Sequence, residues 1–185
     1  MKKLFTWIVP FFVLMGFFIM LGTELFQHKQ DAISSQMLGE PLPVFHLTNL
    51  LQPQKEFTSR DLLGHVSLLN VWATWCYACQ QEHEVLLDIK ENYHVPIYSI
   101  DYRDKTEVAR AWLIKLGNPY LATGEDKTGE VAIDLGVYGT PETFIIDANG
   151  RIRYRHVGRL DQETWEKVLW PLVQKYNKEV TGGPH

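Results

Sequence analysis

The chain is poor in cysteine and has no block of positive charge. Two cysteines in 185 residues exclude a framework of several disulfide bridges. The formal net charge is −4 and no long run of Lys and Arg occurs, which argues against nucleic acid as a partner, because phosphate binding depends on clustered basic side chains. With 45% hydrophobic residues, the chain can form one globular domain with a buried core and a short appendage.

Charge of either sign is missing from a stretch near the N-terminus. Leu4 to Thr23 contains no charged side chain, and a helix of this length spans roughly 30 Å, the thickness of a hydrocarbon core. Lys2 and Lys3 precede it and Glu24 follows it, so the positive-inside rule predicts that the rest of the chain lies outside the membrane. A cleaved signal peptide is the alternative, but the apolar run exceeds the roughly 7–15 residues usual for one, and no small-x-small site ends it.

The sequence therefore predicts four segments. Residues 1–23 form a cytoplasmic N-terminus and a transmembrane signal-anchor, and the polar, irregular residues 24–40 form a tether. Residues 41–177 form one domain, and residues 178–185 form a flexible tail. Outside the membrane the domain meets an oxidising compartment, where disulfides persist unless something reduces them.

Apolar runs in the domain alternate with helical patterns. Val66–Ala73 is a continuous apolar run, typical of a strand buried on both faces, and a helix from Cys76 to Asn92 follows it. The same reasoning predicts the later elements: a strand at Val95–Ile100, a helix at Thr106–Leu116, a short strand near Leu121, a turn of helix near Ala132, a hairpin over Glu142–Val157 with Asn149-Gly150 at its turn, and a helix from Asp161 to Tyr176. This order predicts an α/β domain with a mixed sheet.

Both cysteines lie in "WATWCYACQQEH", between the first buried strand and its helix. Cys76 begins the helix, so backbone N–H groups and the positive end of the helix dipole point at its sulfur and favour the thiolate. Cys79 lies one turn along the same helix, close enough to form a disulfide with Cys76. The spacing predicts a redox pair in which Cys76 attacks a substrate disulfide and Cys79 resolves the mixed disulfide.

Two cysteines at this spacing have three other possible uses. A structural disulfide would close too short a loop to restrict the unfolded chain much. A haem attachment site requires His directly after the second cysteine, where Gln80 stands. Cys76, Cys79 and His83 form a C-x-x-C-x-x-x-H array that could hold a soft ion such as Cu(I). A fourth ligand is not evident, and a buried or capping His83 would explain that residue equally well.

A proline stands directly before a predicted buried strand, in "GTPETF". The X-Pro bond is the one at which a cis peptide is least unfavourable. If Thr140-Pro141 is cis and packs beside Cys76, the backbone of Thr140 could pair with an extended substrate chain. An ordinary proline at a strand entry is the alternative.

Together these motifs resemble the thioredoxin superfamily. The run "DLGVYGTPETFIIDANGRIRYRHVGRL", "KLGNPY" and the N-terminal anchor resemble, more narrowly, the membrane-tethered DsbE (CcmG) family of cytochrome c maturation. The resemblance covers essentially the whole domain. It implies the thioredoxin fold, a cis Pro141, Cys76 as nucleophile and Cys79 as resolving thiol, with no cofactor beyond the redox-active disulfide.

The resemblance also implies a role that composition and spacing do not. Members of this family are periplasmic thiol-disulfide oxidoreductases of the bacterial inner membrane. They reduce apocytochrome c, or its mixed disulfide with a partner, before haem attachment, and a membrane electron donor of the DsbD type keeps them reduced. The alternatives are a copper chaperone that uses Cys76, Cys79 and His83, and a general disulfide oxidant or isomerase on the same fold.

The sequence departs from the thioredoxin pattern at Asn70, where thioredoxins share a buried Asp that handles the proton of the resolving thiol. An amide cannot be that base. We expect Glu142, next to Pro141, to take this role, with Glu82 as the second candidate, because burial raises the pKa of a carboxyl group. A solvent-facing Glu142 in a salt bridge is the alternative.

Aromatic residues flank the cysteines. Trp72 is expected in the core and Trp75 over the cysteines, and Trp75, Tyr77 and Thr140 are expected to contact a peptide substrate. Tyr77-Ala78 also replaces the Pro-containing dipeptide usual in thioredoxins, at positions that help to set the reduction potential. Three arginines that alternate along the predicted hairpin predict a solvated face, with a surface for an acidic partner as the alternative: Arg151, Arg153 and Arg155.

Overall fold

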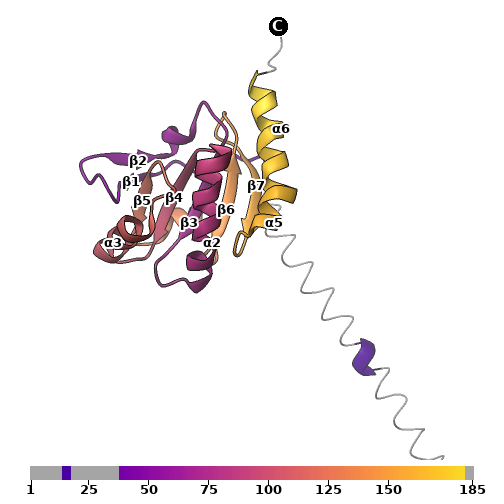
Figure 1. Ribbon diagram of the computed structural model, residues 1–185, viewed down its shortest axis with the longest axis horizontal. Coiled ribbons are helices and arrows are strands. Elements are labelled where there is room, and N and C mark those ends of the chain that lie inside the picture. The colour runs from indigo at the N-terminus through magenta and orange to yellow at the C-terminus, as the bar shows by residue number, and fades with distance from the viewer. Residues whose placement is uncertain (1–13, 18–37, 182–185) are drawn as a thin grey trace, which may run out of the picture. The chain divides into compact units, whose positions relative to one another are not determined.

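The computed structural model describes residues 14–17 and 38–181 (Figure 1). Most of the predicted anchor, most of the tether and the end of the tail lie outside the described residues. Of the anchor, only residues 14–17 are described, and they are helical. None of the helices in the described ranges is long and apolar enough to cross a membrane. The chain divides into two compact units, residues 1–36 and residues 37–185, and the second unit is the folded domain described below.

A mixed sheet of five strands forms the centre of the domain, in the order β5-β4-β3-β6-β7 (Figure 1). Its strands are β3 (Ser67–Trp72), β4 (Ile97–Tyr102), β5 (Thr123–Asp126), β6 (Glu142–Ile146) and β7 (Ile152–Val157). Strands β3, β4 and β5 are parallel, whereas β6 is antiparallel to both β3 and β7. All six residues of β3 are buried, as expected for a central strand covered on both faces. The predicted α/β class with a mixed sheet is confirmed.

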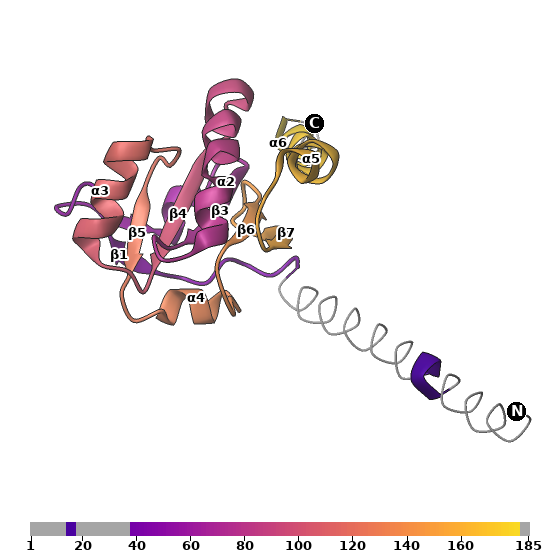
Figure 2. The ribbon, with the colours of Figure 1, turned by 60° about the horizontal axis from the view of Figure 1, so that its bottom comes forward.

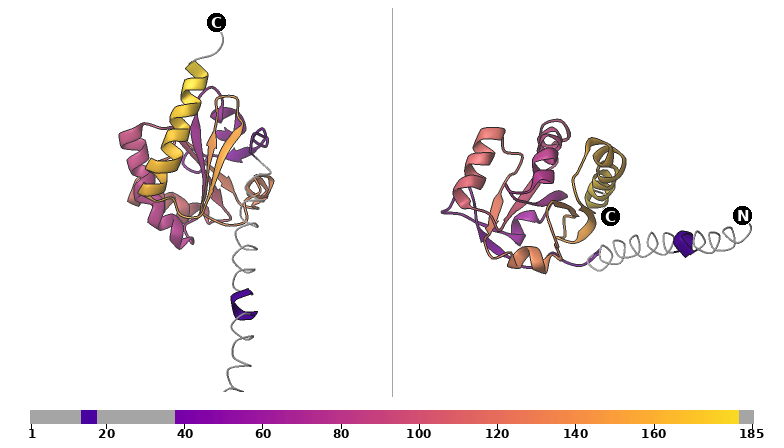
Figure 3. Two further views of the ribbon diagram at one scale, coloured as in Figure 1. Left: turned by 90° about the vertical axis from the view of Figure 1, so that its right-hand side faces the viewer. Right: turned by 90° about the horizontal axis from the view of Figure 1, so that it is seen from below.

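Helices cover one face of the sheet in a row, as Figures 2 and 3 show. They are α2 (Tyr77–Asp88), which continues through one π-helical turn at Ile89–Tyr93, α3 (Thr106–Leu116), and a C-terminal helix made of α5 (Gln162–Thr164), a π turn (Trp165–Leu169) and α6 (Trp170–Thr181). Their apolar side chains form one core with the residues of β3 that face them. The short α4 (Glu130–Asp134) lies on the other face and contributes to a second core.

A small hairpin that the sequence did not predict extends the second core. Strands β1 (His46–Thr48) and β2 (Glu56–Thr58) pair with each other, and a 3-10 turn follows at Ser59–Leu62. The hairpin packs on β5 at Gly124, where an added Cβ would lie 2.7 Å from the Leu47 side chain. Three-residue strands carry too little alternation to be recognised in a sequence, so only the burial of their side chains against the sheet defines them.

The other element boundaries follow local signals that the sequence contains. Helix α3 has the predicted bounds and ends at Gly117, whose φ of 95° is one that glycine adopts without strain. Asp161 caps α5 by accepting a hydrogen bond from the Thr164 N–H at 2.8 Å. The C-terminal helix runs to Thr181, beyond the predicted end at Tyr176.

Candidate active site

The two cysteines lie at the carboxyl end of β3 and the start of α2. They form a disulfide with a Cα–Cα distance of 5.3 Å. Cys76 is the N-cap residue of α2, and its sulfur accepts a hydrogen bond from the Cys79 N–H at 3.1 Å. The Cys76 sulfur therefore stands at the positive end of the helix dipole, where a thiolate is stabilised once the disulfide opens.

The Thr140-Pro141 peptide bond is cis, as expected. It directly precedes β6, whose first residue, Glu142, is the register partner of Val71 in β3. The cis bond therefore lies beside the chain that leads from β3 to Cys76. Within the described residues, the Thr140 backbone has no hydrogen-bond partner, and neither has its buried Oγ1.

Glu142, the expected proton acceptor, lies in a buried ion pair. Its Oε2 accepts a hydrogen bond from Arg155 Nε at 2.6 Å, and its Oε1 accepts one from Arg155 Nη2 at 2.9 Å. Both side chains are only 2% exposed. Oε1 also accepts from the Tyr138 N–H at 3.3 Å. Both carboxylate oxygens are therefore engaged by Arg155, which favours a structural role for Glu142.

This ion pair also corrects the reading of the arginine series. Arg155 is buried, and its Nη2 donates a further hydrogen bond to the Gly136 carbonyl at 2.7 Å. Arg153 is partly exposed and lies 3.3 Å from Asp147 and 3.6 Å from Glu179. The series is therefore not one solvated face.

The second candidate, Glu82, is the buried carboxyl group beside the cysteines. It lies one turn after Cys79 on the buried face of α2, and it is 0% exposed. Oε1 accepts a hydrogen bond from Asn70 Nδ2 at 2.9 Å, and Oε2 accepts one from the Leu160 N–H at 2.8 Å. Burial raises the pKa of Glu82 to about 7 and outweighs these two hydrogen bonds, which lower it.

Asn70 is fixed in one orientation by two further partners. Tyr120 donates its phenol hydrogen to Asn70 Oδ1 at 2.9 Å, and Asn70 Nδ2 donates to Thr143 Oγ1 at 3.1 Å as well as to Glu82. All four side chains are buried. Asn70, at the position where the thioredoxin pattern has an Asp, therefore acts as an amide donor to the buried Glu82 of the neighbouring helix α2.

His83, the third residue of the copper alternative, is used in packing. Its Nε2 lies 3.1 Å from the Gly117 carbonyl oxygen and 3.4 Å from that of Leu116, at the end of α3. Its ring meets Trp112 edge-on at 4.2 Å between centroids, and burial lowers the pKa of the imidazole. In the ranges that the structure describes, no three His, Cys, Asp or Glu side chains are grouped to hold a metal. The capping explanation of His83 is the one that these contacts support.

Two aromatic side chains are exposed beside the disulfide. The Trp75 residue is 58% exposed and Tyr77 is 73% exposed. Trp75 turns its indole toward the end of β4, where its ring lies 6.3 Å from that of Tyr102 and its Nε1 lies 3.4 Å from the Arg103 carbonyl oxygen. Trp72 is buried, as predicted, and donates a hydrogen bond to Ser99 Oγ at 3.1 Å.

Known proteins are similar to this chain in sequence. The family model described as Redoxin matches residues 37–169. The thiol:disulfide interchange protein DsbE of Vibrio cholerae is 42% identical over 178 residues, which cover 94% of this chain and 95% of that protein. DsbE of Escherichia coli K12 is 44% identical over 149 residues, 80% of each chain. The chain belongs to the DsbE family of thiol:disulfide interchange proteins.

Solved structures of similar proteins have the same fold. A structure of a DsbE-type thiol:disulfide interchange protein from Chlorobium tepidum has a TM-score of 0.66 at 24% identity and covers 75% of this chain and 96% of that one. A secreted thiol-disulfide isomerase from Corynebacterium glutamicum has a TM-score of 0.63 at 23% identity, with 72% and 85% covered. The fold of this DsbE-family chain is therefore thioredoxin-like, as the resemblance implied.

Two residues near the DsbE site escaped sequence reasoning. Tyr120 lies in "KLGNPY", but nothing in that segment signals that its phenol reaches Asn70. Asp104 lies after β4 and accepts a hydrogen bond from the Thr74 N–H, in the loop before Cys76. The position of Asp104 near the cysteines could have been inferred from the sequence. Strands β3 and β4 are parallel neighbours, so the chain segments that follow them meet at one edge of the sheet.

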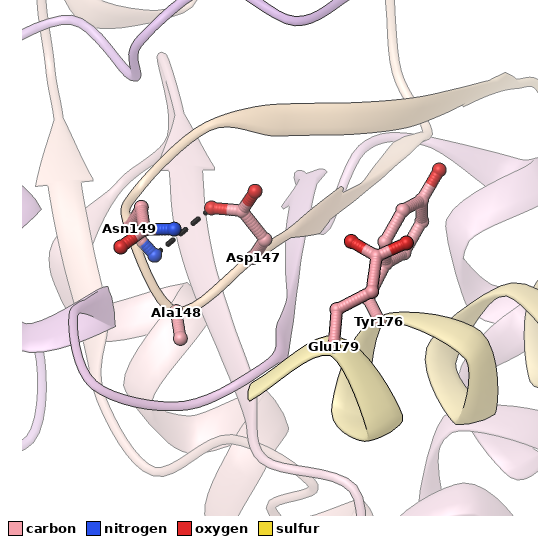
Figure 4. A pocket seen from close by; sticks show the side chains of 5 residues that line it. All are labelled: Asp147, Ala148, Asn149, Tyr176 and Glu179. Atoms are coloured by element: carbon pink, nitrogen blue, oxygen red, sulfur yellow. Dashed lines mark hydrogen bonds between the residues drawn. The ribbon is translucent and has the colours of Figure 1, made fainter. Parts of the chain in front are cut away.

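A pocket in this DsbE-family domain lies at the other end of the sheet (Figure 4). It is lined by Asp147, Ala148 and Asn149 of the β6–β7 turn and by Tyr176 and Glu179 of α6. Asp147 already accepts hydrogen bonds from the Asn149 and Arg151 N–H groups. Its carboxylate therefore stabilises the hairpin turn, at the end of the sheet away from the cysteines.

Proposed function

We propose that this protein is a periplasmic disulfide reductase, anchored in the bacterial inner membrane by residues 1–23, that reduces apocytochrome c or a partner protein before haem attachment. The observation that carries the proposal is the Cys76–Cys79 pair at the N-terminus of α2 in a chain of the DsbE family. The uncharged run Leu4–Thr23, with Lys2 and Lys3 before it, supports the anchor and its orientation. A membrane donor of the DsbD type would return the electrons.

The reaction is a pair of thiol-disulfide exchanges. In the reduced protein, the Cys76 thiolate attacks one sulfur of the substrate disulfide, and a mixed disulfide forms while one substrate thiolate leaves and takes up a proton. Cys79 then loses its proton and attacks the Cys76 sulfur, which releases the second substrate thiolate. Two electrons pass to the substrate, and the protein is left with the disulfide that the structure contains.

Glu82 is the acceptor that we propose for the Cys79 proton. A free thiol has a pKa of about 8.5, whereas the pKa of Glu82 is raised to about 7. The carboxylate is therefore partly ionised at neutral pH, yet it is basic enough to take a proton from a thiol in a buried site. Asn70 cannot take a proton, but it holds Glu82 with its amide hydrogen.

The unpartnered backbone of Thr140 supports a role in binding an extended substrate segment. Its peptide groups have no partner among the described residues and adjoin the chain before Cys76, so a substrate strand can pair with them. Trp75 and Tyr77 offer exposed aromatic surface on the neighbouring loop and helix. This arrangement favours a peptide disulfide over a small disulfide as the substrate.

The test of the proposed function is the reduction potential of the Cys76–Cys79 couple in the full chain, together with the reduction of a disulfide in a C-x-x-C-H peptide. We expect a potential near or below about −200 to −230 mV, the range of glutaredoxins, and rapid reduction of the peptide. Equilibration with dithiothreitol and thiol trapping measure the potential. A value near about −120 mV, typical of DsbA, would make the protein an oxidant and contradict the proposal.

A Glu82→Gln substitution tests the proton acceptor. We expect release of substrate from the mixed disulfide to slow by about 100-fold at pH 7, because general-base catalysis typically contributes 10²–10⁴-fold. Only ionised Glu82 accepts a proton, so the wild-type rate should rise as pH increases through about 7. In the variant this rise should move toward the ionisation of the thiol itself, at about 8.5. Stopped-flow measurements from pH 5.5 to 9 would give the rate of substrate release for the wild type and for the variant.

The matched control is Glu84→Gln, which removes one charge from the exposed face of the same helix. It should leave the pH profile unchanged. An unaltered profile in the Glu82 variant would assign proton transfer to another group or to water.

A further inference from the structure

The turn after β4 holds the loop before Cys76 at two points. Asp104 Oδ2 accepts a hydrogen bond from the Thr74 N–H at 2.5 Å, and the Arg103 carbonyl oxygen accepts one from Trp75 Nε1 at 3.4 Å. From the opposite side, Gln80 Nε2 donates to the Thr74 carbonyl at 2.9 Å. Both peptide groups of Thr74 are thus bound by side chains, and the exposed Trp75 follows directly in the chain.

The turn is itself held in an unusual conformation. Arg103 has a φ of 47°, which is uncommon for a residue other than glycine and is retained only where the surroundings enforce it. Its Nε donates to the Thr128 carbonyl at 2.8 Å. Gly129 makes room for this contact, because a Cβ there would lie 2.4 Å from that nitrogen. Asp104 Oδ1 also accepts the Lys105 N–H at 2.7 Å.

A buried acid supports Asp104 from the end of β4. Asp101 is 2% exposed and lies level with Trp72 of β3 and Glu125 of β5. Its Oδ1 has no hydrogen-bond partner among the described residues, and the Asp104 side chain is near enough to raise its pKa. Burial first, and then the nearby Asp104 and Glu125, together raise the pKa of Asp101 to about 8 against the lowering effect of Lys127. The buried Tyr120 also faces the group. Asp101 therefore lies next to the side chain that accepts the Thr74 N–H, so its ionisation should be felt at that hydrogen bond.

We propose that Asp104 is a positioning residue for substrate capture, which fixes the Thr74–Trp75 loop so that the exposed indole is preorganised beside the cysteines. The inference rests on the proposed function, because it concerns the same peptide substrate. A loop that is ordered before binding loses less conformational entropy when the substrate docks. Asp104 touches neither sulfur, so its loss should weaken peptide binding without changing the reactivity of the cysteines.

Asp104→Ala and Asp104→Asn in the full chain test the inference. The alanine variant loses the acceptor for Thr74, and we expect its KM for a C-x-x-C-H disulfide peptide to rise about 10-fold with kcat within about 2-fold of wild type. The asparagine variant keeps an uncharged acceptor and should recover part of that loss. The rate with oxidised glutathione should be unchanged in both. Glu107→Gln, which removes an exposed charge three residues further along the chain, is the matched control.

The Thr74 amide resonance gives a readout that is independent of turnover. In the wild-type protein this resonance should shift as pH increases through about 8, as Asp101 ionises beside Asp104. In Asp101→Asn the shift should be lost. A wild-type KM in Asp104→Ala, or equal losses with the peptide and with glutathione, would overturn the positioning role while leaving the proposed function intact. A wild-type protein that reduces no peptide disulfide would overturn both.

Discussion

Replacing Cys79 with alanine is expected to convert the protein into a covalent trap for its substrate. Cys76 keeps its place at the N-terminus of α2, but the hydrogen bond from the residue 79 N–H now reaches a free thiolate. That thiolate still attacks the substrate disulfide, whereas no second thiol remains to resolve the mixed disulfide. Catalytic turnover should therefore cease, with close to one substrate chain bound to each protein molecule.

Mass spectrometry after mixing the reduced variant with a C-x-x-C-H disulfide peptide would detect the adduct. The matched control is Cys76→Ala, which keeps the buried thiol of Cys79 and should form no adduct on the same time scale. If the adduct formed instead in Cys76→Ala, through Cys79, the assignment of nucleophile and resolving thiol would be reversed. If it forms in Cys79→Ala as expected, the same Cys79→Ala variant, mixed with a periplasmic extract, would capture the natural client protein.

The parts of the site that could be predicted are those determined over a few residues. The continuous apolar run of β3 and the position of Cys76 at the start of α2 are local, as is the end of α3 at Gly117. The cis bond before Pro141 was implied by the family motif and is present. In contrast, the β1–β2 hairpin has three-residue strands and becomes apparent only where it packs on Gly124.

The choice between Glu142 and Glu82 depended on contacts that are distant in sequence. Glu142 is paired with Arg155 across the β6–β7 hairpin, and Glu82 is bound by Asn70 from β3 and by the Leu160 N–H. The predicted hairpin about Asn149-Gly150 already placed residues 142 and 155 on adjoining strands, so the ion pair could have been inferred. The partners of Glu82 could not have been inferred in this way. One of them, Leu160, lies in a loop whose position depends on how the C-terminal helix packs.

Glu142→Ala is expected to destabilise the fold by about 3–5 kcal/mol, because removal of one partner leaves a buried charge without compensation. The charge left behind is the guanidinium of Arg155, whose side chain is 2% exposed. Urea unfolding of the oxidised protein, followed by circular dichroism, would measure the loss. Glu163→Ala is the matched control, since it breaks the Lys167–Glu163 pair, whose side chains are 71% and 73% exposed. That substitution should change stability by less than about 1 kcal/mol.

A double variant, Glu142→Gln with Arg155→Met, separates the ion pair from a proton-transfer role. Removing both charges should restore much of the stability, because an apolar side chain of similar length can replace a buried guanidinium without leaving an unpaired charge. If Glu142 serves only the fold, the double variant should resolve mixed disulfides with the pH profile of the wild type. A stable double variant that lost the rise through about pH 7 would return the proton acceptor to Glu142. If only Glu82→Gln loses the rise through about pH 7, the proton acceptor is Glu82. Glu142 and Arg155 then serve to hold the strand that follows the cis proline.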